Sequence, residues 1–326
     1  MLQPSFLRQK PTPRQSLVIS RLLLLCLLAS TGVQAASFVV IADLNGRYGA
    51  IGYHPRVTQA ISAIIESKPD FVIIAGDMIA AQRKPLLAGP TLDAMWAAFD
   101  AEVAQPLSKA GIPLVATAGN HDASAYADFA SDREAYAKYW LGRPTPSNLL
   151  PGSQYPWHYA AGFDSTLVIS LYGTAPGALP VEQTSFARAI LDGYADNYDR
   201  VIVTTHLPIY PIANGRVKGT LSPASLQPIM DSQHVDWYIS GHHHAFYPGR
   251  VHGNLKGTVY LASPALGGNR RTWLNSGALS PFGFVKVAQN GNISLHSAPD
   301  FEREVPTGLP LEIGRLRLAE DLINSD

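Results

Sequence analysis

Phe38 to Ala42 (FVVIA) and Phe71 to Ala75 (FVIIA) are two continuous apolar runs, and each is followed by a polar segment that contains an aspartate. A third run, Leu114 to Ala118, leads into Gly119-Asn120-His121-Asp122. Unbroken apolar runs of this length are typical of strands that are buried on both faces. Parallel strands of this kind gather polar residues at their carboxyl ends, where α/β folds bind ligands.

Apolar residues recur at helical spacing between these three runs. One pattern extends from Val57 to Ile65 and stops at Lys68-Pro69, and a second extends from Leu92 to Leu107. Pro106 lies inside the second pattern, where it is expected to kink or divide the helix. The order strand, helix, strand, helix, strand therefore indicates the α/β class.

The remainder of the chain continues to alternate. We expect helices over residues 123–141, 181–191 and 224–230, and strands over residues 166–171, 201–205, 235–240, 258–262, 282–287 and 293–296. The proline-rich segment 144–156 is expected to be a surface loop. No repeat or linker is apparent, so residues 36–326 are predicted to form one domain.

A more charged C-terminal extension begins at about residue 299. Its apolar residues Ile313, Leu316, Leu322 and Ile323 predict an amphipathic terminal helix that packs on its own domain. Docking of that helix to a membrane or a partner is the alternative.

Composition excludes one class of partner. The chain has 326 residues, a formal net charge of +0, 46% hydrophobic residues and 15% charged residues. This is enough to bury a large core. A neutral balance argues against a nucleic-acid partner, which would require a basic surface.

The first 35 residues have the pattern of a secretory signal. Four basic residues precede or flank the apolar run Leu22 to Ala29, and small residues follow at Val33 and Ala35, near which cleavage is expected. The run is too short to span a bilayer, which predicts a periplasmic or secreted protein with no transmembrane span after cleavage; an uncleaved anchor is the alternative. The single cysteine, Cys26, lies in this segment, so no disulfide is expected.

Gly241-His242-His243-His244 follows the apolar run that begins at Val235. Alternate residues of an extended segment point the same way, so His242 and His244 are expected to share a target while His243 faces elsewhere. A metal site and a solvated polar loop both fit this triplet when it is taken alone.

The polar residues at the strand ends keep one order along the chain, and this order resembles the calcineurin-like metallophosphoesterase superfamily. That superfamily has the motifs D-x-H, G-D, G-N-H-D/E, a lone histidine and G-H-x-H. The matching residues here are Asp43 with Asn45, Asp77, Asn120 with His121 and Asp122, His206, and His242 with His244. The resemblance covers residues from about Phe38 to His244. It implies a layered sandwich of two mixed β-sheets flanked by helices.

The resemblance also implies a ligand set for two cations that share Asp77. The first cation would also be held by Asp43, His244 and the residue at Asn45, and the second by Asn120, His206 and His242. Imidazole and oxygen ligands together suit Mn, Fe or Zn. Two such ions would activate a hydroxide that hydrolyses a phosphate mono- or diester. The resemblance places His121 over the leaving group, with Asp122 orienting its other ring nitrogen.

One position departs from this pattern, and two arginines add to it. The superfamily has histidine where this chain has Asn45. This difference is expected to weaken the first cation site, or to let that site recruit a neighbour such as Tyr48. The alternative is that Tyr48 is an ordinary aromatic residue of the loop. Arg270 and Arg271 follow Gly267-Gly268 and can grip a phosphate of the substrate, or else lie on a solvated loop.

Two other functions remain open at this point. A degenerate relative could use the fold as a binding or scaffold surface, which Asn45 alone favours. A metal hydrolase acting on a bond other than one to phosphorus has compatible ligand chemistry. The expected partner is a small phosphorylated substrate; its identity and the oligomeric state are not encoded in any motif.

Overall fold

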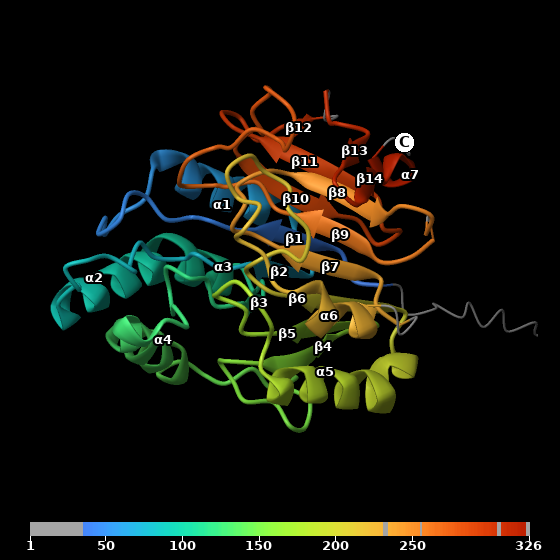
Figure 1. Ribbon diagram of the computed structural model, residues 1–326. Helices are drawn as coiled ribbons and strands as arrows, with labels where there is room; N and C mark the ends of the chain where they lie inside the picture. Colours follow the sequence, from blue (N-terminus) through green and yellow to red (C-terminus); the bar gives the residue numbers. More distant parts are fainter. Residues whose placement is uncertain (1–34, 231–233, 255, 305–307, 324–326) are drawn as a thin grey trace, which may run out of the picture. The chain divides into compact units, whose positions relative to one another are not determined.

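The computed structural model describes residues 35–230, 234–254, 256–304 and 308–323 (Figure 1). Contacts divide the chain into two units, Met1–Gly32 and Val33–Asp326, and the second is described below. The predicted signal segment lies outside the described residues, except for Ala35 at its end. In the described part of the chain, no helix has the length and apolar character needed to cross a membrane.

The first β-sheet has six strands in the order β12-β11-β10-β1-β2-β3. Strands β1, β2 and β3 are parallel, and β10 and β11 join them as antiparallel neighbours. Their bounds are β1 Phe38–Ile41, β2 Phe71–Ile74, β3 Leu114–Ala116, β10 Gly283–Val287, β11 Ile293–Ser297 and β12 Arg303–Glu304.

The second β-sheet has eight strands in the order β13-β14-β8-β9-β7-β6-β5-β4. Strands β5, β6, β7 and β9 are parallel, and antiparallel strands flank them on both sides. Their bounds are β4 Tyr159–Phe163, β5 Thr166–Ser170, β6 Arg200–Thr204, β7 Trp237–Ser240, β8 Tyr247–Val251, β9 Val259–Ala262, β13 Glu312–Ile313 and β14 Leu316–Leu318. Both sheets are mixed, as the resemblance implies.

The two sheets pack face to face. Alternate residues of β1 point to opposite sides, so Phe38 and Val40 lie in the core between the sheets while Val39 and Ile41 face the helices. The Phe38 ring stacks on Phe71 at 5.4 Å and meets Trp237 of the second sheet edge-on at 6.2 Å between ring centroids. Strands buried on both faces explain why their sequences are unbroken apolar runs.

Helices cover the outer faces of the sandwich (Figure 1). α1 (Pro55–Ser67), α2 (Gly89–Phe99), α3 (Gln105–Lys109) and α4 (Ala130–Leu141) pack on the first sheet, and α5 (Val181–Tyr194) and α6 (Pro223–Met230) pack on the second. The predicted layered sandwich of two mixed sheets flanked by helices is therefore confirmed.

Pro106 does not end the second predicted helix but lies where its hydrogen bonding changes. α2 continues through a π-helical turn, η1 (Asp100–Ala104), into α3, in which Pro106 occupies the first turn. Because proline has no N–H to donate to the preceding turn, the regular α-helical pattern is interrupted there.

The predicted C-terminal amphipathic helix is wrong. Ile313 and Leu316 face each other across the hairpin β13–β14, whose turn contains Gly314 at a φ of 57°. Within the described residues of the extension, only α7 (Glu320–Ile323) is helical. The spacing of three residues between Ile313 and Leu316 fits one face of a helix, and it also fits the two sides of a two-residue hairpin turn. Gly314 favours the turn, because glycine readily adopts a positive φ. The extension thereby adds β12 to one sheet and β13 and β14 to the other.

Other departures are local. The helix predicted over 123–141 begins only at Ala130, after a 3₁₀ turn, η2 (Ala127–Phe129). A second 3₁₀ turn, η3 (Ala195–Asn197), follows α5. The sequence analysis missed β4 and β8; β8 contains Pro248 and Gly249, which are rare inside strands.

Candidate metal centre

The candidate ligands lie in the loops that follow β1, β2, β3, β6 and β7, so both sheets contribute to one place. Backbone hydrogen bonds join these loops directly: Asp43 N–H donates to Gly76 O at 3.0 Å, and Gly241 N–H donates to His206 O at 3.0 Å. Asp43, Asp77 and His206 are at most 1% exposed. Such buried polar side chains need partners in the site itself.

Four of the candidate ligands have a left-handed backbone. They are Asp43 (φ 53°), Asp77 (φ 59°), His242 (φ 64°) and His244 (φ 53°). This conformation costs a non-glycine residue about 1–3 kcal/mol and is concentrated at functional sites. The loop geometry is therefore maintained against local strain.

Two glycines of the motifs are required by close approach. A Cβ at Gly119 would lie 2.0 Å from the Asp77 backbone nitrogen, and a Cβ at Gly241 would lie 2.7 Å from Ala75 O. Both distances are shorter than any non-bonded contact allows, so only glycine lets these loops touch.

Asp77, His206 and His242 form a candidate metal-binding group, since each offers one ligand atom within 4.8 Å of the others. His206 Nε2 lies 3.3 Å from Asp77 Oδ2 and 3.0 Å from Asn120 Oδ1. The structure thus brings together the four residues that the resemblance assigned to the second cation.

Hydrogen bonds outside this group aim its atoms inward. His206 Nδ1 donates to Ala75 O at 2.8 Å, which leaves Nε2 facing the site. The Asn120 amide nitrogen donates to Gln82 Oε1 at 2.7 Å, which turns Oδ1 inward. Gln82, which the sequence analysis missed, is held by Ser124 Oγ at 3.0 Å.

Asp43 and His244 form the second half of the centre. His244 Nε2 lies 3.1 Å from Asp43 Oδ1, while its Nδ1 donates to Asn269 O at 2.5 Å. The His242 backbone N–H donates to Asp43 Oδ2 at 3.0 Å. Asn45 lines the cavity beside them, but its side-chain amide makes no hydrogen bond among the described residues. Asn45 is therefore near the centre without being oriented as firmly as the other candidates.

The charges of the centre suit cations. Burial alone would lower the pKa of His206, but the ion pair with Asp77 outweighs it and raises this pKa to about 9. The pKa of His244 is likewise raised, because Asp43 outweighs burial. Positive charge is thus favoured at both places, and the donor set of imidazole nitrogens with carboxylate and amide oxygens fits transition-metal cations.

His121 lies in the cavity as predicted, but Asp122 does not orient it. His121 Nδ1 donates to Ala81 O at 3.0 Å, and its Nε2 lies 3.9 Å from Asp77 Oδ2. The predicted contact between the Asp122 carboxylate and the imidazole is therefore wrong. Adjacent residues in a tight turn point in different directions, and a backbone carbonyl has taken the place of the carboxylate.

Asp122 instead binds the loop that carries Asp77. Its buried carboxylate accepts the backbone N–H groups of Asp77 (2.8 Å), Met78 (2.7 Å), Ile79 (2.9 Å) and Gly119 (2.8 Å). Burial, together with the charge of Asp77, raises the pKa of Asp122 to about 7, against the effect of the N–H donors. Asp122 is thus a positioning residue for the metal ligands.

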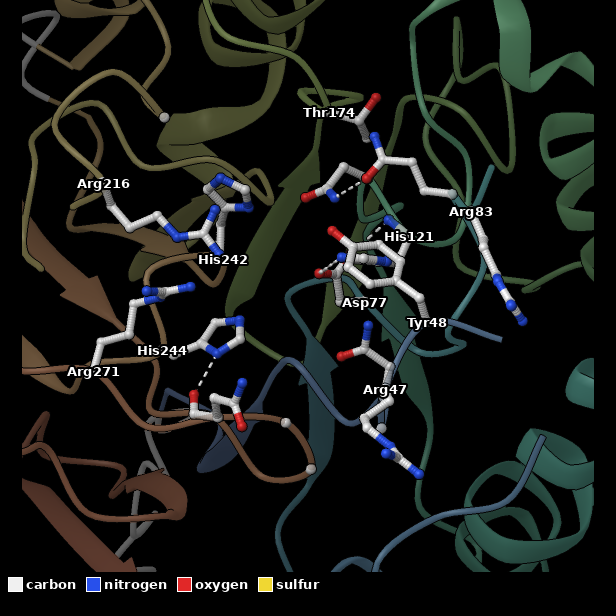
Figure 2. A pocket seen from close by; sticks show the side chains of 18 of the residues that line it. Arg47, Tyr48, Asp77, Arg83, His121, Thr174, Arg216, His242, His244 and Arg271 are labelled. Carbon is white, nitrogen blue, oxygen red and sulfur yellow. Dashed lines mark hydrogen bonds and ion pairs between the residues drawn. The ribbon is translucent and has the colours of Figure 1, made fainter. Parts of the chain in front are cut away.

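A cavity of about 1120 Å³ opens onto the centre and carries a basic lining (Figure 2). Arg271 lines it as predicted, but Arg270 does not: its guanidinium lies over the Phe282 ring at 5.3 Å. Tyr48, 58% exposed, places its ring 4.6 Å from that of His121. Further basic residues of the lining were missed by the sequence analysis: Arg47, Arg83, Arg216 and Lys218.

His243 faces away from the centre, as the alternation predicted. It is fully buried; its Nδ1 accepts the Ile212 N–H at 3.1 Å, and its Nε2 donates to Gly219 O at 3.0 Å. The middle histidine therefore holds a neighbouring loop.

A family model described as calcineurin-like phosphoesterase matches residues 36–246. Among solved structures, the purple acid phosphatase PPD1 from yellow lupin (Lupinus luteus) seeds aligns with a TM-score of 0.63 and 16% identity, over 83% of this chain and 52% of that one. A dimetal phosphatase from Danio rerio aligns with a TM-score of 0.55 and 14% identity, over 83% of this chain and 98% of its own.

GAP50, described as the anchor in the inner membrane complex of Plasmodium, also shares the fold, with a TM-score of 0.50 and 15% identity over 87% of this chain and 89% of that one. The chain spans about half the length of the lupin protein. No curated protein sequence matches it significantly. At these identities the three structures are evidence for the fold alone.

Replacing Asp122 by asparagine should destabilise the centre. An amide offers one acceptor and one donor where four N–H groups converge, so we expect a loss of about 1–3 kcal/mol in the free energy of unfolding and about 10- to 100-fold in metal affinity. Urea unfolding and metal titration measure the two effects, with Asp128→Asn at an exposed position as the control. A variant with normal stability and metal affinity but slow turnover would instead place Asp122 in the chemistry.

Acid should weaken metal binding. A ring nitrogen that carries a proton cannot bind a cation, and the pKa of His206, raised to about 9, keeps a proton on that ring in the metal-free protein at neutral pH; the pKa of His244 is raised as well. Apparent affinity should therefore fall by about 10- to 100-fold for each pH unit below about 7, as one or both protons compete. Calorimetric titration with Mn²⁺ or Zn²⁺ measures this slope; an affinity unchanged down to about pH 4 would contradict the ligand set.

Proposed function

The chain belongs to the calcineurin-like phosphoesterase family, and from this we propose that it is an exported hydrolase that uses two divalent cations to cleave phosphate esters. The observation that supports this most is the convergence of Asp77, Asn120, His206 and His242 at the floor of a cavity with a basic lining. Buried ligands, an open cavity and positive charge are what a phosphoester hydrolase requires.

We assign the cations to the two halves of the centre. Asp77 would be shared; Asp43, His244 and more weakly Asn45 would hold one ion, and Asn120, His206 and His242 the other. Such ions, when bound, polarise phosphoryl oxygens and lower the pKa of a bound water. Mn, Fe and Zn all match the ligand types.

His121 would act on the leaving group. Its Nδ1–H is held by Ala81 O, and its Nε2 lies 3.9 Å from Asp77 Oδ2. As a general acid, the Nε2–H of the imidazolium would donate its proton to the departing ester oxygen, which neutralises the charge that develops as the P–O bond breaks. The backbone N–H of His121, bound to Asp77 Oδ1 at 2.8 Å, fixes the residue relative to the ligands.

Export rests on the sequence of residues 1–35, with its basic start, apolar run and small residues before Ala35. We therefore place the mature protein in the periplasm or outside the cell. The family resemblance leaves the substrate open beyond a small phosphorylated molecule.

A binding or scaffold role is the second candidate. Asn45, in place of a histidine ligand, favours it, and the shared fold of the Plasmodium anchor makes it reasonable. The other candidate ligands lie together, and His206, Asn120 and His244 are each oriented by a hydrogen bond to a residue outside the centre. This arrangement favours the enzymatic function over the scaffold role.

The metal-loaded protein should hydrolyse p-nitrophenyl phosphate, its bis-ester or both. Chelation with EDTA should abolish this activity, and Mn²⁺, Fe²⁺ or Zn²⁺ should restore it, because the proposed nucleophile is a hydroxide that forms only when the cations are bound. Absorbance of p-nitrophenolate and metal analysis of the purified protein are the measurements. No hydrolysis of either substrate together with near-zero metal content would favour the scaffold.

His121→Asn should lower kcat by about 10²- to 10⁴-fold without changing the metal stoichiometry. The defect should be larger with an alkyl phosphate such as glycerol phosphate than with p-nitrophenyl phosphate, since an alkoxide needs a proton more than p-nitrophenolate does. Steady-state kinetics on both substrates test this, with the exposed His252→Asn as a control. Equal defects on both substrates would argue against proton donation.

A further inference from the structure

Two arginines from separate loops stand on one side of the cavity. Figure 2 shows Arg216 and Arg271 on the side of His242 and His244, with His121 and Tyr48 across from them. The proximity of the arginines is evident in the pKa of Arg271, which burial lowers and the charge of Arg216 lowers further. Figure 2 also shows the Arg216 side chain extending toward His242, and both residues line the cavity.

The loops that carry these arginines are joined. Leu274 N–H donates to Ile212 O at 2.7 Å, and Ala213 pairs with Trp273 in an isolated β-bridge. The Asn214 side chain donates to Thr272 Oγ1 at 2.9 Å. His243 binds Ile212 and Gly219 on either side of Arg216, so both guanidinium groups extend from a rigid frame.

Neither guanidinium is neutralised. The Nε atoms of Arg216 and Arg271 are buried and have no hydrogen-bond partner among the described residues, and neither arginine is in an ion pair there. Other partly buried arginines have an acceptor for the guanidinium: Arg200 donates to Ala36 O and Gln289 O at 2.7 Å, and Arg250, whose Nε is also without a partner, pairs through Nη1 with Asp321 at 2.6 Å. Two partly buried like charges for which the described residues offer no acceptor point to the position of an anion.

We propose that Arg216 and Arg271 bind the unesterified oxygens of a phosphate monoester, and that the protein is a monoesterase rather than a diesterase. This inference rests on the proposed function. His121 lies on the opposite side, where the leaving group departs, so the arginines face the part of the phosphoryl group that stays behind.

The charge and shape of the two ester types differ at this place. A monoester carries close to two negative charges at neutral pH because its second pKa is about 6, whereas a diester carries one. A diester also presents an ester oxygen and its substituent to the arginines, which leaves guanidinium N–H groups without an acceptor. Sites built to bind a charged or polar group reject analogues that lack it.

The experiment compares p-nitrophenyl phosphate with bis-p-nitrophenyl phosphate, which share a leaving group. The wild-type protein should prefer the monoester in kcat/KM by at least about 100-fold, and the double variant R216Q/R271Q should lose about 100-fold on the monoester and less than about 10-fold on the diester. Arg270→Gln, at the neighbouring position outside the cavity, is the matched control and should keep the wild-type ratio. Circular dichroism and metal content confirm that each variant is folded and loaded.

A wild-type preference for the diester, or equal losses on both substrates in R216Q/R271Q, would overturn the inference while leaving phosphoester hydrolysis intact. Hydrolysis of neither substrate would refute the proposed function. Calorimetry then decides the inference alone: inorganic phosphate should bind the metal-loaded wild type more than about 10-fold more tightly than dimethyl phosphate, and R216Q/R271Q should lose this difference. Equal binding of the two anions would overturn it.

Discussion

The buried carboxylate of Asp122 is the contact on which the arrangement of the centre depends. Four backbone N–H groups from the loops after β2 and β3 donate to its two oxygens and oppose the rise in its pKa to about 7 that burial and the charge of Asp77 cause. That contact fixes Asp77 in a left-handed conformation beside Gly119, where a Cβ would collide. The Asp122 side chain thus positions Asp77, the ligand that we propose two cations share.

The strand ends were predictable because the physics that produces them is local. A strand buried on both faces must be apolar throughout, and its end is marked by the first polar residues, which here are Asp43, Asp77 and His206. Gln82 and Arg216 were not predictable, since they lie in loops whose residues follow no period. The role of Asp122 was misread because the resemblance implied a contact with the His121 ring, whereas a shared motif does not determine the direction of each side chain in the turn.

The basic cavity could not be predicted from the overall composition. The chain as a whole carries no formal net charge, yet its cavity is lined by four arginines and a lysine. Net charge reports the sum over the whole surface, whereas binding depends on the local field. Local position also separates the roles of His242, His243 and His244. The outer two face the centre, and the middle one binds the loop that carries Arg216.

The two sheets supply different types of candidate ligand to the centre. The loops after β1, β2 and β3 supply only oxygen donors, Asp43, Asp77 and Asn120, and every imidazole ligand comes from the loops after β6 and β7. The oxygen donors of the first sheet alone would form a hard ligand set suited to Mg²⁺ or Ca²⁺. In the proposed centre, His206, His242 and His244 add the imidazoles that suit transition metals, so its metal preference would depend on the packing of the second sheet against the first.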